Sequence, residues 1–487
     1  MSQTTVARGV IEALDDAPLS RFHFRAVLTA GTGFFTDAYD LFIIGTALAL
    51  IKVEYHPSAV VIGLVGSTAL LAAFVGSTVF GRIADVFGRK KIYGLEAAIM
   101  AVAAIGSALA PNLIWLIAWR FVLGIGIGGD YPVSAVLMSE YSNRKNRGRL
   151  VGMVFSMQAL GLIAGPLVAL VILGLGVHPE IAWRLMLGLG AIPALAVIYL
   201  RRTLPESPRY RALVQGRAAD AAVAIRRYSK GVVDAGGRAV GRQTRLGLRQ
   251  FLTNPRYLVL LLGTAGCWFM FDYAFYGNTI STPLILKAVA PHASLISDTA
   301  IALLIFTVAA APGYLLAFLT VDRIGHRRLQ FIGFTLMGLA FLAIGLVPGL
   351  TTLIVPFVLV YGLSYFFTEF GPNTTTFLLA SELYPVSART TGHGISAGLA
   401  KVGAFVGTLT FPLVSASLGL SGVMTIAAGT AGIGLLLTRV LPEPSGRSLE
   451  EMGGEVEAPA EPASAEVRPP SLARPAVASA APRQPVS

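Results

Sequence analysis

Long apolar stretches separated by short polar loops dominate the chain. A helix needs roughly 20 apolar residues to cross the hydrocarbon core of a bilayer, which is about 30 Å thick. Such stretches cover residues 26–51, 60–82, 92–111, 114–137, 150–175, 182–202, 257–283, 299–321, 329–348, 353–379, 393–416 and 420–441. They lack the apolar–polar alternation of transmembrane β-strands. The pattern predicts an all-α membrane protein with twelve transmembrane helices.

A long polar segment over 203–256 divides these stretches into two sets of six. We therefore expect an N-terminal six-helix bundle over 26–202 and a C-terminal six-helix bundle over 257–441. A short segment over 1–25, the central loop over 203–256 and a tail over 442–487 lie outside the bundles. The tail is rich in Pro, Ala, Ser and Glu from about residue 453, a composition that predicts a mostly disordered segment.

Composition excludes a water-soluble protein. Only 13% of the residues are charged and 54% are hydrophobic, with a mean hydropathy of +0.69, whereas soluble proteins carry about 25% charged residues. The net charge of +12 does not indicate a nucleic-acid partner, because the basic residues gather in alternate loops. The positive-inside rule then places both termini and the central loop in the cytoplasm. We expect a multi-pass protein of the plasma (inner) membrane.

No cofactor, metal or enzymatic motif is evident. The single cysteine, Cys267, excludes an internal disulfide and a cysteine-based zinc site. The six histidines show no paired metal spacing. The chain also lacks a Walker A loop and a nucleophile elbow, so we do not expect an enzyme.

The two halves echo each other in sequence. Ser139-Glu140 closes the fourth stretch and Ser381-Glu382 the tenth, and an arginine follows each, at Arg147 and Arg389. A duplication of this kind places the substrate site between the halves, near the bilayer midplane. We interpret the charged residues of the echoing loops as gating residues at the cytoplasmic helix ends: Asp85, Arg89, Lys90, Glu140, Arg147, Asp322, Glu382 and Arg389. Over residues 21–450 the chain resembles a major facilitator superfamily transporter, which implies the fold of two pseudo-symmetric six-helix bundles.

Ionisable residues inside the apolar stretches indicate function, since each costs at least about 2.5 kcal/mol in a bilayer. Asp37 and Asp40 stand at i and i+3 in the first stretch, so they share one helix face. Asp130 follows a glycine-rich run in the fourth. Two further features lie in the second half: the stripe Trp268, Asp272 and Tyr276 at spacings of four, and Lys401.

This set of acids around one lysine fits either a cation or a protonatable anion. Buried carboxyl groups near one another need not all be charged. A protonated carboxyl donates a hydrogen bond, and an ionised one accepts from a solute that still carries acidic hydroxyls. Phosphate carries them near neutral pH and sulfate does not, so contact with carboxylates favours phosphate.

Four motifs sharpen this interpretation: Thr-Asp-Ala-Tyr-Asp-Leu-Phe at 36–42, Gly-Gly-Asp-Tyr-Pro at 128–132, the Trp-x₃-Asp-x₃-Tyr stripe, and Gly-Pro-Asn-Thr-Thr-Thr-Phe at 371–377. They resemble the motifs of the phosphate:proton symporters of the superfamily. The resemblance implies phosphate binding by Tyr131, Gln158, Trp268, Asp272, Tyr276 and Asn373, with Lys401 as the matching eleventh-span lysine. It also implies proton coupling by Asp37 and Asp130, and Asp40, which matches the same first-span motif, is a further candidate proton site.

We therefore expect proton-coupled uptake of inorganic phosphate by alternating access, with the lipid bilayer as the surroundings and a monomer as the functional unit. Two alternatives remain open. One is a proton symporter of an organic anion such as an aromatic acid or a sugar derivative, although Ala38 departs from the Asp-Gly-Tyr-Asp motif of aromatic-acid transporters. The other is a non-transporting phosphate sensor on the same fold.

Overall fold

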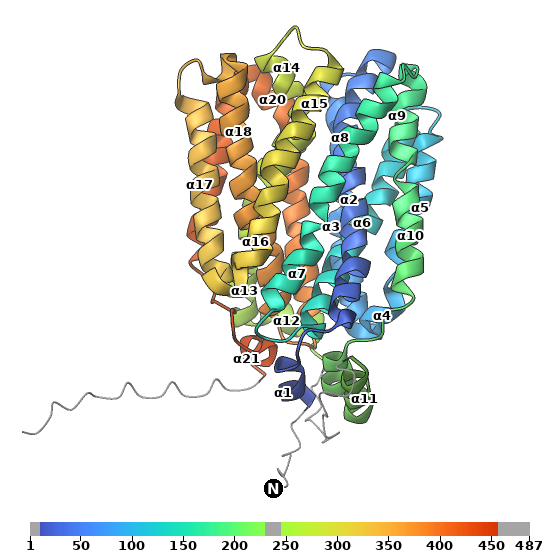
Figure 1. Ribbon diagram of the computed structural model, residues 1–487, viewed down its shortest axis with the longest axis vertical. Coiled ribbons are helices and arrows are strands. Elements are labelled where there is room, and N and C mark those ends of the chain that lie inside the picture. The colour runs from blue at the N-terminus through green and yellow to red at the C-terminus, as the bar shows by residue number, and fades with distance from the viewer. Residues whose placement is uncertain (1–9, 229–244, 456–487) are drawn as a thin grey trace, which may run out of the picture.

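The computed structural model describes residues 10–228 and 245–455. Helices run side by side in two groups, with the first half of the chain beside the second (Figure 1). In the first half, the bundle helices are α2 (Arg21–Tyr55), α3 (Ala59–Phe87), α4 (Arg89–Ile92), α5 (Leu95–Ala108), α6 (Leu113–Tyr141), α7 (Arg147–Ser156), α8 (Gln158–Gly174), α9 (Pro179–Gly188) and α10 (Ala191–Arg201).

The second bundle contains α13 (Pro255–Ile280), α14 (Thr282–Val289), α15 (Leu295–Ile305), η2 (Phe306–Ala310), α16 (Ala311–Ile324), α17 (His326–Leu346), η3 (Leu350–Thr352), α18 (Ile354–Thr368), η4 (Glu369–Asn373), α19 (Thr374–Glu382) and α20 (Arg389–Thr438). Side chains cap several helix starts, as expected for exposed backbone N–H groups. Asn112 accepts hydrogen bonds from the first turn of α6, and Asn254 does the same for α13, which continues with a proline.

Eleven of the described helical segments are long and apolar enough to cross a membrane, and α20 accounts for two crossings. Its 50 residues would extend to about 75 Å as one straight helix, more than twice the hydrocarbon core. The helix breaks at Gly419, whose φ of 66° suits glycine. Both ends of α20 return to the same face of the bundle, because Arg389 hydrogen-bonds Leu449 and Glu443 caps α17. The prediction of twelve transmembrane helices in the major facilitator fold is confirmed.

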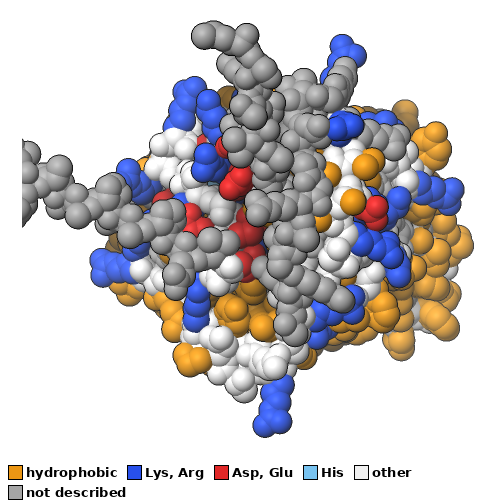
Figure 2. All heavy atoms as spheres, turned by 90° about the horizontal axis from the view of Figure 1, so that it is seen from below, with side chains coloured by type: hydrophobic (Ala, Val, Ile, Leu, Met, Phe, Trp, Pro, Cys, Tyr) orange, Lys and Arg blue, Asp and Glu red, His pale blue; other side chains and the backbone are white. Residues whose placement is uncertain are grey.

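Short helices gather at one end of the bundle, which we call the terminal face because both described chain ends lie there (Figure 1). They are α1 (Val10–Asp15), η1 (Tyr210–Val214), α11 (Ala218–Tyr228), α12 (Leu248–Thr253) and α21 (Leu449–Gly453). Lysine and arginine side chains surround this face (Figure 2). Residues 456–487, most of the segment predicted to be disordered, lie outside the described residues; the short helix α21 lies just before that segment.

The sequence echoes of the two halves correspond to matching contacts. Glu206, after the sixth crossing, accepts from the backbone N–H of Lys90 at the start of α4. Glu443, after the twelfth, accepts from the first two N–H groups of α17. In each bundle, a glutamate that follows the last crossing thus caps the helix that begins the third crossing of the same bundle. A carboxylate at that position is favoured by the helix dipole.

Candidate functional site

The predicted solute residues meet between the two halves, in the interior of the bundle. Tyr131 on α6 and Gln158 at the first position of α8 come from the first half. The second half contributes α13, η4 and α20, with Trp268, Asp272, Tyr276, Asn373 and Lys401. All seven side chains are buried.

Local breaks in the helices aim these side chains inward. The α7 helix ends at Ser156 and α8 restarts at Gln158, so the amide lies at a helix start. Asn373 ends η4, a π-helical turn that contains Pro372, a residue without a backbone N–H. Single π-turns of this kind are frequent at functional sites because they rotate the following side chains.

Hydrogen bonds join the site into one chain across the halves. The Gln158 amide Nε2 donates to Tyr131 Oη at 2.9 Å, and the Tyr131 and Tyr276 hydroxyls lie 3.3 Å apart. Lys401 Nζ donates to Tyr276 Oη at 2.9 Å and to Asp272 Oδ2 at 2.8 Å. The ammonium also lies 4.6 Å from the ring centre of Tyr131. Hydroxyl, amide and ammonium donors therefore converge around one acid, a set that suits an oxyanion.

The same chain continues to the asparagine through a tyrosine. Tyr314 Oη donates to Gln158 Oε1 at 3.1 Å and accepts from Asn373 Nδ2 at 2.7 Å. Asn373 also donates to Glu369. Trp268 packs against this group, with its ring centre 6.1 Å from that of Tyr131. The structure thus brings together all seven residues that the sequence predicted.

The three predicted proton sites have different surroundings. Asp130 pairs with Arg201 at 2.6 Å, and Gly33 leaves the room for this pair: a Cβ there would lie 2.1 Å from Asp130 Oδ2. Asp37 interacts electrostatically with Asp130 and Lys401, yet neither of its oxygens has a hydrogen-bond partner among the described residues. Within residues 10–228 and 245–455, no lysine or arginine forms an ion pair with Asp37, although Arg201 and Lys401 interact with it electrostatically.

Asp40 interacts electrostatically with Asp37, but its other contacts lie away from the solute residues. Its backbone carbonyl accepts from Arg120, and its carboxylate packs against the backbone of Gly190, where a Cβ would lie 1.9 Å from Oδ1. The structure therefore places Asp40 inside the first bundle, against α9 and α10. It does not join the hydrogen-bonded chain around Tyr131.

Seven of the eight predicted gating residues form two groups of charged side chains at the terminal face, one around Arg89 and one around Glu382, which together we call the latch. It consists of Asp85, Arg89, Glu140, Arg147, Asp322, Glu382 and Arg389. Lys90 contributes its backbone N–H to Glu206, and its side chain is exposed.

The latch ties the first half to the second. Asp85 accepts from the backbone N–H of Thr391 at 2.6 Å, and Glu140 pairs with Arg389 at 3.2 Å. Arg147 pairs with Glu382 at 3.2 Å. All of these groups are buried, so the terminal face is closed in this structure.

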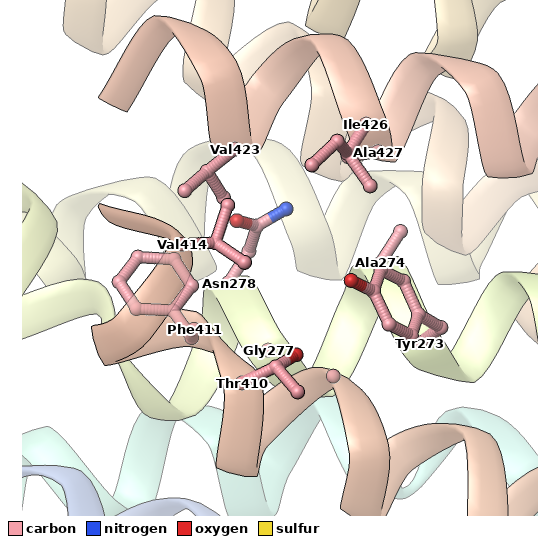
Figure 3. A pocket seen from close by; sticks show the side chains of 11 residues that line it. Tyr273, Ala274, Gly277, Asn278, Thr410, Phe411, Val414, Val423, Ile426 and Ala427 are labelled. Carbon is pink, nitrogen blue, oxygen red and sulfur yellow. The ribbon is translucent and has the colours of Figure 1, made fainter. Parts of the chain in front are cut away.

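A small cavity between α13 and the two arms of α20 is not the solute site (Figure 3). Its volume of about 20 Å³ holds about one water molecule. The lining is largely apolar, and Asn278 presents its amide to the space (Figure 3).

Comparison with known proteins fits this geometry. A family model described as "Sugar (and other) transporter" matches residues 26–455. The chain belongs to this transporter family. Among its relatives, a probable inorganic phosphate transporter 1-6 from Arabidopsis thaliana is 35% identical over 499 residues, covering 92% of this chain and 96% of the relative. A low affinity inorganic phosphate transporter 4 from Medicago truncatula is 36% identical over 512 residues, covering 92% and 94%.

A solved structure agrees with the fold of the transporter. The proton:xylose symporter XylE bound to 6-bromo-6-deoxy-D-glucose has a TM-score of 0.75 with 19% identity, and the match covers 89% of this chain and 99% of XylE. At this identity the likeness concerns the fold. The chain thus belongs to the transporter family with the major facilitator fold, and inorganic phosphate transporters are among its relatives.

Sequence reasoning missed several charged residues of this transporter. Glu96, Arg120 and Glu369 lie within apolar stretches, so the criterion applied to Asp130 would have found them. Arg201 stands at the end of the sixth stretch, where a basic residue is ordinary, and it pairs with both Glu96 and Asp130. Tyr314 gave no signal, because one tyrosine in an apolar helix has no distinguishing pattern.

Proposed function

We propose that this chain imports inorganic phosphate together with protons, by alternating access across the plasma (inner) membrane. The main observation in its support is a buried chain of hydrogen bonds that joins the two halves. This chain runs through Gln158, Tyr131, Tyr276 and Lys401. The names of the inorganic phosphate transporters among its relatives support the solute.

The donor set supports phosphate over other anions. Lys401 and Asp272 form a buried pair, so the site carries little net charge before the solute arrives. A phosphate oxygen can accept from the amide, phenol and ammonium groups, while a phosphate hydroxyl donates to Asp272. Sulfate has no hydroxyl at neutral pH and would leave this carboxylate facing an anion. Two negative charges that face each other in a buried site without a shared hydrogen bond repel each other, which is unfavourable.

Asp37 and Asp130 act as the proton sites in this proposal. A proton on one of them lowers the negative charge of the cavity and lets the anion bind. The latch then opens, the terminal face admits water, and loss of the proton repels the phosphate. The basic rim of the terminal face supports a cytoplasmic location for it and for both termini. We expect one chain to suffice for transport, because donors of both halves complete the site.

Asp130→Asn tests the coupling. The variant keeps the size of the side chain and removes its charge, so we expect it to insert in the membrane and to lose phosphate accumulation driven by an acidic exterior. Asp298→Asn is the matched control, because this buried acid lies in the first turn of α15, outside the site. Undiminished acid-driven accumulation by Asp130→Asn would end the assignment. Competition by benzoate, in the same assay, would indicate an organic anion instead.

A further inference from the structure

We propose that Glu369 is a further proton-carrying carboxyl, which acts from the second half of the transporter; the inference rests on the proposed function. Glu369 is fully buried in η4. One of its oxygens, Oε2, accepts from Asn373, a predicted phosphate ligand. The other, Oε1, has no hydrogen-bond partner among the described residues.

Two other buried acids of the site, Asp272 and Asp130, differ from Glu369 because each has a cation as its partner. Asp272 has Lys401 at 2.8 Å, and Asp130 has Arg201 at 2.6 Å. In the described part of the chain, no lysine or arginine forms an ion pair with Glu369. An ionised carboxylate in such surroundings lacks compensation for its lost hydration. The neutral form is therefore favoured whenever the cavity is dry.

Among the described residues, the elements packed against η4 present hydrogen-bond donors and acids to Glu369 but no ion-pairing lysine or arginine. Tyr314 on α16 is a phenol within hydrogen-bonding reach of Glu369, and Tyr365 on α18 interacts with it electrostatically; neither side chain carries a positive charge. The α17 helix contributes Gly333 against Gly371. Asp272 on α13 is a further acid, which interacts electrostatically with Tyr314. Within η4 and α19, Asn373 and Thr374 are neutral.

The position of Glu369 links its proton to the solute. Asn373 contacts both Glu369 and Tyr314, and Tyr314 contacts Gln158. A protonated Oε1 is a neutral hydroxyl, which leaves Asn373 free to orient toward an anion without repulsion. When the latch has opened and water enters, the O–H bond of Oε1 breaks and the proton passes to water. The carboxylate that remains disfavours return of the phosphate.

Glu369→Gln tests whether the proton on Glu369 is transported or stays bound throughout the cycle. Glutamine imitates the protonated acid and cannot release a proton. The assay is the number of protons moved per phosphate, obtained in proteoliposomes from the pH gradient that balances a given phosphate gradient. We expect the variant to move one proton fewer, so that accumulation at a gradient of one pH unit falls about tenfold. Exchange of labelled for unlabelled phosphate without a gradient should persist. Glu54→Gln is the matched control, because Glu54 accepts a hydrogen bond from Trp183 in the first bundle and has no contact with the solute residues. This variant should keep the wild-type ratio of protons to phosphate.

An unchanged ratio in Glu369→Gln would overturn the inference, because Glu369 would then hold its proton throughout the cycle. If this variant fails to transport, protons taken up when inorganic phosphate binds are counted with a pH indicator in detergent, where one fewer than wild type supports the inference. Glu369→Asp retains a carboxyl group and should keep the wild-type count. Loss of phosphate binding in both variants would overturn it as well. Failure of the proposed function is distinct, because wild-type protein would then show no proton-driven phosphate uptake.

Discussion

Gln158 joins a phenol of the first half to a phenol of the second, so its replacement tests how the two halves share the solute. Its amide donates to Tyr131 at 2.9 Å and accepts from Tyr314 at 3.1 Å. Gln158→Leu keeps a similar volume and removes both contacts. In the loaded state the variant also lacks one donor to a charged solute.

The expected loss follows from that donor. A hydrogen bond to a charged group contributes about 1.5–3 kcal/mol, which corresponds to roughly a 10- to 150-fold weaker phosphate affinity. We expect this change in the half-saturating phosphate concentration for uptake into proteoliposomes. Protein abundance and thermal stability are measured on the same preparations.

Gln330→Leu is the matched control. Gln330 is an equally buried amide on α17 that donates to Thr438 at 2.8 Å and accepts from Thr375 at 3.0 Å. These contacts lie wholly within the second half, so this variant should lose thermal stability and keep its phosphate affinity. Equal phosphate affinity in the two variants would refute the place of Gln158 in the site.

The remaining predictions concern the latch, the terminal face and the proton site. Asp85→Asn removes a buried ion pair and should destabilise the closed state by about 3–5 kcal/mol. The latch then opens more often, so a cysteine introduced behind it should react faster with thiol reagents than the same cysteine in the wild-type background. Burial alone would raise the pKa of Glu450, but Arg209 outweighs it and holds that pKa below its usual value. The stabilisation is therefore present above the unfolded pKa of about 4.3 and is lost as the pH falls through the folded value. Hydrogen exchange of the α21 amides should be equally slow at pH 6 and pH 8 after correction for the intrinsic rate, and faster below about pH 4. Gly33→Ala places a Cβ 2.1 Å from a carboxylate oxygen of Asp130; we expect lower proton-driven uptake than in Gly432→Ala, where the space is open.

Hydropathy was enough to predict the crossings, because a bilayer imposes one length on every apolar stretch. Lys401 did not obscure the eleventh crossing, since Asp272 and Tyr276 satisfy its ammonium inside the bundle. The break at Gly419 has only a glycine as its signal in the sequence, and in the structure it divides α20 into two helical arms.

The sequence indicates which acidic residues lie inside the bundle, but it does not indicate which cations pair with them. Asp130 pairs with an arginine 71 positions further along the chain, and no local pattern specifies that contact. Asp37 and Asp40 share a helix face in sequence, yet only Asp37 interacts with Lys401, because Asp40 packs against the break between α9 and α10. Side-chain pairing across a bundle depends on helix rotation, which the sequence alone does not give.

The most direct test of the account is the uptake of labelled phosphate by the purified protein in proteoliposomes with an imposed pH gradient. We expect accumulation when the exterior is acidic, its loss when a protonophore collapses the gradient, and competition by unlabelled phosphate but not by sulfate or benzoate. Phosphate entry that is indifferent to the gradient, or uptake abolished by benzoate, would contradict proton-coupled phosphate import.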